Sequence, residues 1–338
     1  MIVNGFPDRE ITVNNIPFLY FGGTAYLGLP TNTEFKNSVS KSLNKWGSFY
    51  GSSRNSNIKL SVYDKVEALF AEQIGAEASV TVSSGTLAGK LVLGCLSKNN
   101  KSFYHLPKTH PAILHQDSLP VFINGELHPN LKNETLEDIV ITMDSILALE
   151  VEPTSIKFID SISSQKKITL VIDESHSLGI IGKHGLGIFN TISNKNIKQK
   201  IMISSLGKAL GISGGLIASD KNFINSIKEE ALFISSSSAN PAYLEAYLDS
   251  QDLIKSQREK LDSNLVFFFK DLNLDATFKY HKKYPVLYCS DNTIYNRLFD
   301  QGIIITNFKY PTYKGIMSRI VITSNHTQED LKQLKRAL

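Results

Sequence analysis

Three side chains whose chemistry belongs together follow two apolar runs of the sequence. Asp173 and His176 come at the end of the run at 168–172, and Lys208 follows the run at 201–203. Both runs have the composition of strands buried in a parallel sheet, and such strands deliver the residues at their carboxyl ends to one edge of the sheet. We therefore expect an acid, an imidazole and an amine at one site.

These three groups are the ones that a protein needs to hold pyridoxal phosphate. A carboxylate at the end of a buried strand is costly without a cationic partner, and the pyridinium nitrogen is such a partner for Asp173. From the same segment, His176 can reach the phenolic oxygen of the ring. An amine in a dry, cationic pocket has a lowered pKa and can form a Schiff base, which is the role expected of Lys208. Taken one at a time, a helix cap, a turn histidine and a surface lysine are the ordinary alternatives.

A candidate phosphate site precedes these segments in the chain. Residues 83–86 read Ser-Ser-Gly-Thr, between an expected strand and an expected helix. Backbone amides at the N-terminus of a helix bind phosphate without any cationic side chain, although many α/β turns have this composition. The candidate residues are Ser84, Gly85, Thr86 and, from the lysine segment, Ser205.

Other patterns fail on their surroundings. A P-loop is excluded because Met202 stands where its first glycine is needed. The segment 211–215 fits G-x-S-x-G by letters but precedes a strand, whereas a nucleophile elbow follows one. The glycines at 182–187 have the wrong spacing for a dinucleotide fingerprint. No Cys/His spacing is typical of zinc, so we expect no metal site.

The surrounding sequence predicts an α/β protein with a mostly parallel, doubly wound sheet. Strand and helix patterns alternate up to about residue 220, and this alternation places a site at the carboxyl ends of the strands. The expected strands are residues 79–82, 102–104, 120–123, 139–142, 168–172, 201–204 and 215–218, and the expected helices are 35–46, 60–74 and 87–96.

After residue 220 the pattern is that of a smaller α+β unit. The expected elements are a long helix at 244–271, short strands at 286–289, 302–306 and 318–323, and a final helix at 328–338. The first 30 residues are rich in Pro, Gly and Asn and indicate an extended arm. We predict an N-terminal arm (1–30), a large cofactor-binding domain (31–235) and a small C-terminal domain (236–338).

Composition and charge exclude several classes of protein. The 338 residues are 42% hydrophobic and 20% charged, and the net charge of +4 is spread over scattered lysines, so we expect no nucleic-acid partner. No apolar run approaches the roughly 18 residues of a membrane span, and no signal peptide is recognisable, so the cytoplasm is expected. Cys95 and Cys289 lie in apolar stretches and indicate buried thiols in a reducing compartment.

With these residues identified, the chain resembles the α-oxoamine synthases, which are pyridoxal-phosphate enzymes of the aspartate aminotransferase fold (fold type I). This family includes 8-amino-7-oxononanoate synthase, 2-amino-3-ketobutyrate CoA ligase and serine palmitoyltransferase. The resemblance covers most of the chain from about Phe21. Four segments carry it: 21–29 is similar to the family's N-x-Y-L-G-L element, 51–54 to its G-S-G-G-S-R turn, 173–187 to D-E-A-H-x-x-G-x-x-G-x-x-G-x-G, and 205–208 to T-x-G-K.

The resemblance implies a role for each candidate residue. Lys208 would bind the cofactor as a Schiff base and move the α-proton of the substrate. Asp173 would bind the pyridine nitrogen and His176 the 3-hydroxyl, while His110 would stack on the ring. Arg319 would bind the carboxylate of the amino acid, a task that suits a planar, bidentate fork. The phosphate would be held by Ser84, Gly85, Thr86, Ser205, Ser236 and Ser237.

Two further implications concern partners and substrates. The hydroxyls of Ser236 and Ser237 would come from a neighbouring subunit, which implies a homodimer with active sites at the subunit interface. Thr24 and Arg54, which stand in two of the motifs, are the remaining expected substrate contacts.

Several positions depart from the family's pattern, and they concern the substrates. Thr24 replaces the asparagine of N-x-Y-L-G-L, Tyr63 replaces a histidine of the first long helix, and residues 142–144 read Thr-Met-Asp where the family has T-E-G. The arm before Phe21 is also shorter than the helical region that helps the family to bind acyl-CoA. These changes leave the acyl acceptor open.

The favoured function is a decarboxylating condensation of a small α-amino acid with an acyl thioester, either acyl-CoA or a carrier-bound acyl group. The alternative is an aminotransferase, which needs the same Lys208 and Asp173 but a 2-oxo acid as second substrate. His176 and the glycines at 182–187 favour the condensation, whereas the missing CoA-binding features favour the aminotransferase. A non-catalytic protein that retained the fold is opposed by the joint presence of these residues and Arg319.

Overall fold

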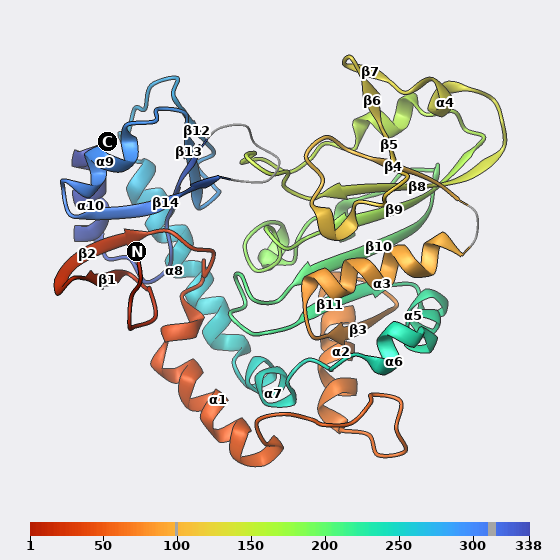
Figure 1. The fold of residues 1–338 in the computed structure, drawn as a ribbon, viewed down its shortest axis with the longest axis horizontal. Helices are drawn as coiled ribbons and strands as arrows, with labels where there is room; N and C mark the ends of the chain where they lie inside the picture. The colour runs from red at the N-terminus through yellow and green to blue at the C-terminus, as the bar shows by residue number, and fades with distance from the viewer. Residues whose placement is uncertain (99–100, 310–315) are drawn as a thin grey trace.

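Two sheets organise the protein in its computed structural model, which describes residues 1–98, 101–309 and 316–338 (Figure 1). The larger sheet has seven strands and contains the segments that were expected to carry the chemistry. Its strands, in spatial order, are β3 (Ala78–Val82), β11 (Gly215–Ser219), β10 (Ile197–Ser205), β9 (Lys166–Asp173), β8 (Glu137–Asp144), β4 (Ser102–His105) and β5 (Leu119–Pro120).

The pairing within this sheet confirms the prediction of a mostly parallel sheet. Strands β10, β9, β8, β4 and β5 run parallel to one another, whereas β11 is antiparallel to both of its neighbours, β10 and β3. The last six residues of β8 and of β9 are all buried. Inner strands of a parallel sheet are covered on both faces, which explains why these runs are continuously apolar.

Alternating residues of these strands enter two separate cores. Val171 packs with α3 (Gly85–Ser97) and α5 (Lys221–Glu229) on one face, whereas Leu170 and Ile172 belong to the core on the other face. Successive side chains of a strand point to opposite faces, so a run without alternation serves both cores.

Several connections are shorter than the sequence pattern predicted. Only 3-10 turns join β8 to β9 and β9 to β10, at Lys157–Ser161, Lys183–Gly185 and Phe189–Thr191. The strand expected at 120–123 is divided between β5 and β6 (Phe122–Ile123), which pairs with β7 (Glu126–Leu127).

The long helix expected at 244–271 is two helices, α7 (Pro241–Asp249) and α8 (Gln251–Phe269). Ser250 separates them with φ −110° and ψ 20°, a backbone conformation outside the helix. The helices expected at 35–46 and 60–74 are present as α1 (Thr33–Trp46) and α2 (Ser61–Ile74).

The smaller sheet combines strands from the two ends of the chain. Its spatial order is β1 (Glu10–Val13), β2 (Ile16–Phe21), β14 (Ile303–Lys309), β15 (Ile316–Val321), β13 (Val286–Cys289) and β12 (Phe278–Tyr280). The red N-terminal hairpin therefore lies beside the blue C-terminal strands in Figure 1. Helices α9 (Ile294–Phe299) and α10 (Gln328–Ala337) complete this part, and the proposed division into arm, large domain and small domain stays a prediction.

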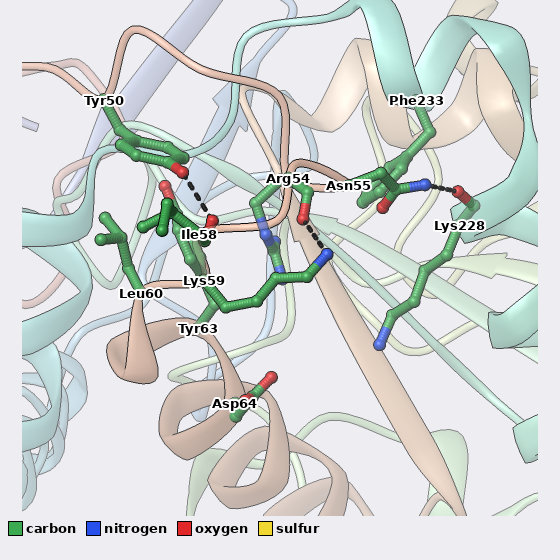
Figure 2. A pocket seen from close by; sticks show the side chains of 10 residues that line it. All are labelled: Tyr50, Arg54, Asn55, Ile58, Lys59, Leu60, Tyr63, Asp64, Lys228 and Phe233. Carbon is green, nitrogen blue, oxygen red and sulfur yellow. Dashed lines mark hydrogen bonds between the residues drawn. The ribbon is translucent and has the colours of Figure 1, made fainter.

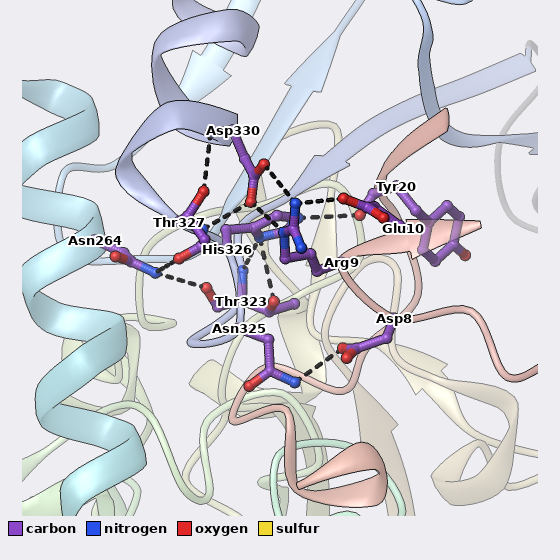
Figure 3. A network of polar contacts seen from close by, with 10 residues as sticks. All are labelled: Asp8, Arg9, Glu10, Tyr20, Asn264, Thr323, Asn325, His326, Thr327 and Asp330. Carbon is purple, nitrogen blue, oxygen red and sulfur yellow. Dashed lines mark hydrogen bonds and ion pairs between the residues drawn. The ribbon is translucent and has the colours of Figure 1, made fainter. Parts of the chain in front are cut away.

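A polar network fixes the N-terminal hairpin to the C-terminal helix (Figure 3). Arg9 forms an ion pair with Asp330 at 2.7 Å. Nε2 of His326 lies 3.1 Å from the carbonyl oxygen of Tyr20. The imidazole of His326 stacks on the ring of Phe21, with ring centroids 4.1 Å apart. The expected arm is therefore an integral part of the smaller sheet.

Over residues 1–98, 101–309 and 316–338, no helix has the length and apolar character needed to cross a membrane. Two short helices remain in the connections, α4 (Pro129–Lys132) and α6 (Ala231–Ser235).

Candidate active site

The carboxyl ends of β8, β9 and β10 meet at one edge of the larger sheet. Asp144 and Asp173 end β8 and β9 at paired positions, and the N–H of Ser145 donates to the carbonyl oxygen of Asp173 over 2.9 Å. At the end of β10, the N–H of Ser205 donates to the hydroxyl of Ser175 over 2.8 Å. Because three parallel neighbours end at the same level, the residues that follow them are held together.

Lys208 lies in the turn between β10 and β11 and faces these strand ends. Burial lowers the pKa of Lys208, and the positive charge of Arg319 acts in the same direction. The carboxylates of Asp173 and Asp144 act in the opposite direction. Within the described residues, the Lys208 amine has no hydrogen bond or ion pair. Burial therefore makes the amine less basic than an exposed lysine, and its role in binding a ligand stays a prediction.

His176 is held by the hydroxyls of two tyrosines. The hydroxyl of Tyr26 lies 3.0 Å from Nδ1 of His176, and the hydroxyl of Tyr284 donates to the carbonyl oxygen of His176 over 3.5 Å. Burial lowers the pKa of His176 well below its usual value, and the positive charge of Lys208 acts in the same direction. The imidazole is therefore neutral at physiological pH.

His110 follows β4 and caps the short turn at Pro111–Ile113. Its Nδ1 accepts the N–H of Ala112 over 3.2 Å, and its own backbone N–H donates to Oδ2 of Asp144 over 2.9 Å. Burial lowers the pKa of His110, while the charge of Asp173 opposes that change. The structure thus brings His110 to the same group of charges as Lys208.

The expected phosphate loop packs directly against the end of β10. Ser84 caps α3 by accepting the N–H of Leu87 over 3.1 Å. A Cβ on Gly85 would lie 2.9 Å from Cα of Ser205, so the two segments touch. The N–H groups of Gly85 and Thr86 have no acceptor among the described residues. A helix N-terminus with free amides beside a serine is suited to bind a phosphate.

Arg319 reaches the site from β15 of the smaller sheet. Its Nη2 donates to the carbonyl oxygen of Gly23 over 3.2 Å, and burial raises the pKa of Tyr288, which the charge of Arg319 lowers. Its Nε is buried and has no partner in the part of the chain that the structure describes. A buried guanidinium N–H without an acceptor is costly, so this position is prepared for an anion.

Arg54 has other partners than the residues around Lys208. It forms an ion pair with Glu67 at 2.9 Å and donates to the carbonyl oxygen of Thr81 at 3.2 Å. Its guanidinium also stacks over the ring of Tyr63, at 3.8 Å from the centroid (Figure 2). These contacts hold Arg54 in the wall of a separate pocket with Lys59 and Lys228.

The remaining predicted residues lie outside the group around Lys208. Ser236 follows α6 and donates its hydroxyl to the carbonyl oxygen of Leu232. Ser237 is exposed. Thr24 follows Gly23, which binds Arg319, and its carbonyl oxygen accepts the N–H of Tyr26 over 2.9 Å. The roles of these three residues stay predictions.

Sequence reasoning missed three residues that shape the site. Tyr26 lies in the N-terminal motif, where its hydroxyl was given no task. Asp144 follows a buried apolar strand, the same signal that identified Asp173. Glu174 is fully buried and accepts the N–H groups of Ile188 and Phe189, each over 2.8 Å, so it fixes the glycine-rich segment after β9.

Known proteins resemble the chain over almost its whole length. The family model described as aminotransferase class I and II matches residues 153–338, which is more than half of the chain. A putative 8-amino-7-oxononanoate synthase of Methanococcus vannielii is 28% identical over 336 residues, covering 94% of this chain and 90% of that protein.

Solved structures share the fold at lower identity. A serine palmitoyltransferase from S. paucimobilis with a bound PLP–myriocin aldimine has a TM-score of 0.81 at 14% identity, covering 99% of this chain and 90% of that one. An 8-amino-7-oxononanoate synthase from Francisella tularensis has a TM-score of 0.69 at 23% identity, covering 95% and 96%. These similarities confirm the predicted aspartate aminotransferase fold.

Proposed function

The chain belongs to the aminotransferase class I and II family, and we propose that it is a pyridoxal-phosphate enzyme of the α-oxoamine synthase type. In the proposed reaction, a small α-amino acid condenses with an acyl thioester and loses its carboxylate as carbon dioxide. The observation that carries the proposal is the meeting of Lys208, Asp173 and His176 at one edge of the sheet. Beside them, the buried Nε of Arg319 has no hydrogen-bond partner among the residues that the structure describes.

The residues present fit pyridoxal phosphate at each of its polar groups. The free amides of Gly85 and Thr86 suit the phosphate. The carboxylate of Asp173 suits a pyridinium nitrogen, because it is almost completely buried and its own hydrogen bond is to the N–H of Ser175, over 2.8 Å. The amine of Lys208 suits the aldehyde, because burial lowers its pKa and it has no hydrogen bond to any residue in the described ranges.

When bound, pyridoxal phosphate supplies a ring that accepts electrons from the α-carbon of the amino acid. Asp173 keeps the ring nitrogen protonated by its negative charge. His176 is neutral, and we infer that its Nδ1 accepts from the hydroxyl of Tyr26, so its Nε2 would carry the proton and would donate to the 3-oxygen.

Lys208 and Arg319 act on the amino acid. Burial lowers the pKa of Lys208, which favours the neutral amine that would hold the cofactor and would take the α-proton of the substrate. Arg319 would bind the substrate carboxylate through its Nε–H, which has no partner among the described residues, and would orient the α-carbon toward that amine.

The condensation is supported by the relative named putative 8-amino-7-oxononanoate synthase, which aligns over 94% of the chain. The second candidate is an aminotransferase that uses a 2-oxo acid, and the description of the matching family supports it. Both candidates use Lys208 and Asp173 in the same way, and they differ in the second substrate.

We also propose a homodimer in which Ser236 and Ser237 of one subunit reach the phosphate of the other. The support is their place at the end of α6, where Ser237 is exposed, as are the apolar side chains of Leu232 and Ile234. The cytoplasmic location expected from the sequence stays a prediction.

Borohydride reduction tests the cofactor assignment. Protein loaded with pyridoxal phosphate is reduced, digested and mapped by mass spectrometry. We expect the label on Lys208, its loss in Lys208→Ala, and its retention in Lys41→Ala, which removes an exposed lysine of α1. A protein that binds no pyridoxal phosphate, or is labelled elsewhere, contradicts the proposal.

The second substrate is then tested with the loaded enzyme. Single amino acids are supplied with acyl-CoA, and free thiol and carbon dioxide are measured together. Equimolar release of both supports the condensation. Formation of pyridoxamine phosphate that a 2-oxo acid reverses, without thiol release, supports the aminotransferase instead.

A further inference from the structure

A second buried carboxylate lies beside Asp173, and the proposed reaction gives it no task. Asp144 ends β8 directly opposite Asp173 on β9, and each of these residues is only 6% exposed. Two adjacent buried acids are costly unless each has a partner. The partner of Asp173 in the proposed function is the ring nitrogen, so the partner of Asp144 has to be found in the protein.

Asp144 binds the backbone of His110. The N–H of His110 donates to Oδ2 of Asp144 over 2.9 Å. The residues before His110 are fixed to the same strand, because the N–H of Leu106 donates to the carbonyl oxygen of Thr142 over 3.0 Å. The hydroxyl of Thr109 in turn donates to the carbonyl oxygen of Leu106 over 2.8 Å. The bond to Asp144 is the last of these links before the imidazole.

The imidazole of His110 has little freedom once its backbone is held. Its Nδ1 accepts the N–H of Ala112, so the ring is fixed to its own turn. Its position is therefore set by the backbone of that turn, and Asp144 is the side chain that ties the turn to the strand ends carrying Asp173.

We propose that Asp144 is a positioning residue, which holds the N–H of His110 and so keeps the imidazole of His110 against the ring of the cofactor. The inference rests on the proposed function, because it requires a ring at this place. Met143, the preceding residue, is fully buried in the core, so Asp144 alone of the two faces the site.

The charges around Asp144 agree with this role. The groups that act on it are Asp173 on β9, Lys208 in the β10–β11 turn and the N–H of His110. Burial raises the pKa of Asp144 well above its usual value, and Asp173 adds to that change. The N–H of His110 acts in the opposite direction, as expected for a donor that binds the carboxyl group, and an oxygen of Asp144 can accept this N–H whether or not the group is ionised.

Cofactor binding and the circular dichroism of the bound cofactor test the proposal. In Asp144→Ala the N–H of His110 loses its acceptor, and we expect the dissociation constant for pyridoxal phosphate to rise about tenfold. The visible circular dichroism, which reports how the ring is held, should fall to the level of His110→Ala. Asp144→Asn keeps a carbonyl oxygen in place and should recover most of the affinity.

A double-substitution cycle separates positioning from general damage. If Asp144 acts through His110, Asp144→Ala combined with His110→Ala binds the cofactor no more weakly than His110→Ala alone. Asp138→Ala, an exposed residue on the same strand, is the matched control and should bind like the unsubstituted protein. The proposal is overturned if the rises in dissociation constant of the two single variants multiply in the double variant. It is also overturned if Asp144→Asn binds the cofactor as weakly as Asp144→Ala.

A measurement on the unsubstituted protein covers the case in which Asp144→Ala does not fold. The amide of His110 should exchange slowly with solvent, because its hydrogen bond lies inside the site. Fast exchange at this amide overturns the proposal. If the unsubstituted protein binds no pyridoxal phosphate, the proposed function fails; if it binds and every Asp144 variant binds equally, only this inference fails.

Discussion

The hydroxyl of Tyr26 lies 3.0 Å from Nδ1 of His176, and it joins a residue of the N-terminal segment to the end of β9. Burial raises the pKa of Tyr26 to about 12 and lowers that of His176 well below its usual value. Both groups are therefore neutral at physiological pH, and we infer that the phenol donates its proton to Nδ1. The proton of the imidazole is consequently on Nε2, the nitrogen left for a ligand.

Tyr26→Phe removes this donor and should release the imidazole from one tautomer. We expect nitrogen NMR of histidine-labelled protein to show a mixture of the two tautomers in place of one. The affinity for pyridoxal phosphate should fall about tenfold, since one buried hydrogen bond is lost and Nδ1 has no replacement.

Tyr104→Phe is the control for this prediction, because Tyr104 is an equally buried tyrosine whose ring contact is to His128. It should leave the His176 signals unchanged. A Tyr26→Phe protein with the original spectrum would show that another group fixes the tautomer.

Arg319→Gln should weaken binding of the amino acid and spare binding of the cofactor. The guanidinium offers a carboxylate a positive charge and a buried Nε–H that has no partner among the described residues. The glutamine side chain has neither the charge nor the fork of N–H donors. We expect KM for the amino acid to rise about 100-fold, as for the loss of a charged hydrogen bond. Arg336→Gln, at an exposed position of α10, is the control, and an equal rise in both variants would argue against a carboxylate site at Arg319.

Gly215→Ala should damage the phosphate loop from the neighbouring strand. A Cβ at this position would lie 2.2 Å from the carbonyl oxygen of Ser84 and 2.7 Å from the N–H nitrogen of Gly85. The loop has to move, so we expect cofactor affinity to fall more than tenfold and the free energy of unfolding to fall by roughly 1–3 kcal/mol.

Gly94→Ala is the matched control for Gly215→Ala. A Cβ on Gly94 meets no atom within 4 Å, and the residue lies inside α3. This variant should bind pyridoxal phosphate normally and gain roughly 0.5–1 kcal/mol of stability, because alanine favours the helix over glycine. Equal affinities in the two alanine variants would show that the loop tolerates displacement.

The positions of Asp173 and Lys208 could be predicted because the signal is local. Each follows an apolar run that is too short for a helix and too continuously apolar for an exposed strand. Such runs form buried parallel strands, and the carboxyl ends of these strands meet at one edge of the sheet. Asp144 has the same signal, yet an acid after a strand is also a common helix cap, so its partnership with His110 became visible only in the fold.

The N-terminal hairpin shows what the local signal lacks. Asn14 and Asn15 have φ of 51° and 64°, the conformation of a tight hairpin turn, and an Asn-Asn pair between two apolar stretches is compatible with it. What the sequence does not contain is the partner of the hairpin, because β2 pairs with β14, far along the chain. Arg54 is a similar case, since its ion pair with Glu67 depends on how α2 packs on β3.

His326 makes the attachment of this hairpin dependent on pH. Its Nδ1 accepts the N–H of Thr323 over 2.9 Å, while Nε2 donates to the carbonyl oxygen of Tyr20. These bonds need the neutral ring, and burial lowers the pKa of His326 to about 4 (Figure 3). The unfolded chain binds a proton here near pH 6.5, whereas the folded chain does so only near pH 4.

Stability should therefore be lost as pH falls from 6.5 toward 4, since the unfolded state gains the proton first. Between pH 6.5 and 5 this group should cost about 2 kcal/mol of unfolding free energy. His326→Asn removes this titrating group. We therefore expect the unfolding free energy of this variant, measured with denaturant, to change by about 2 kcal/mol less between pH 6.5 and 5 than that of the unsubstituted protein. The variant should be less stable than the unsubstituted protein at pH 7.5. His184→Asn, at an exposed turn with φ 59°, a conformation that asparagine tolerates, should keep the original slope. Identical slopes for His326→Asn and the unsubstituted protein would mean that the hairpin stays attached whether or not His326 is protonated.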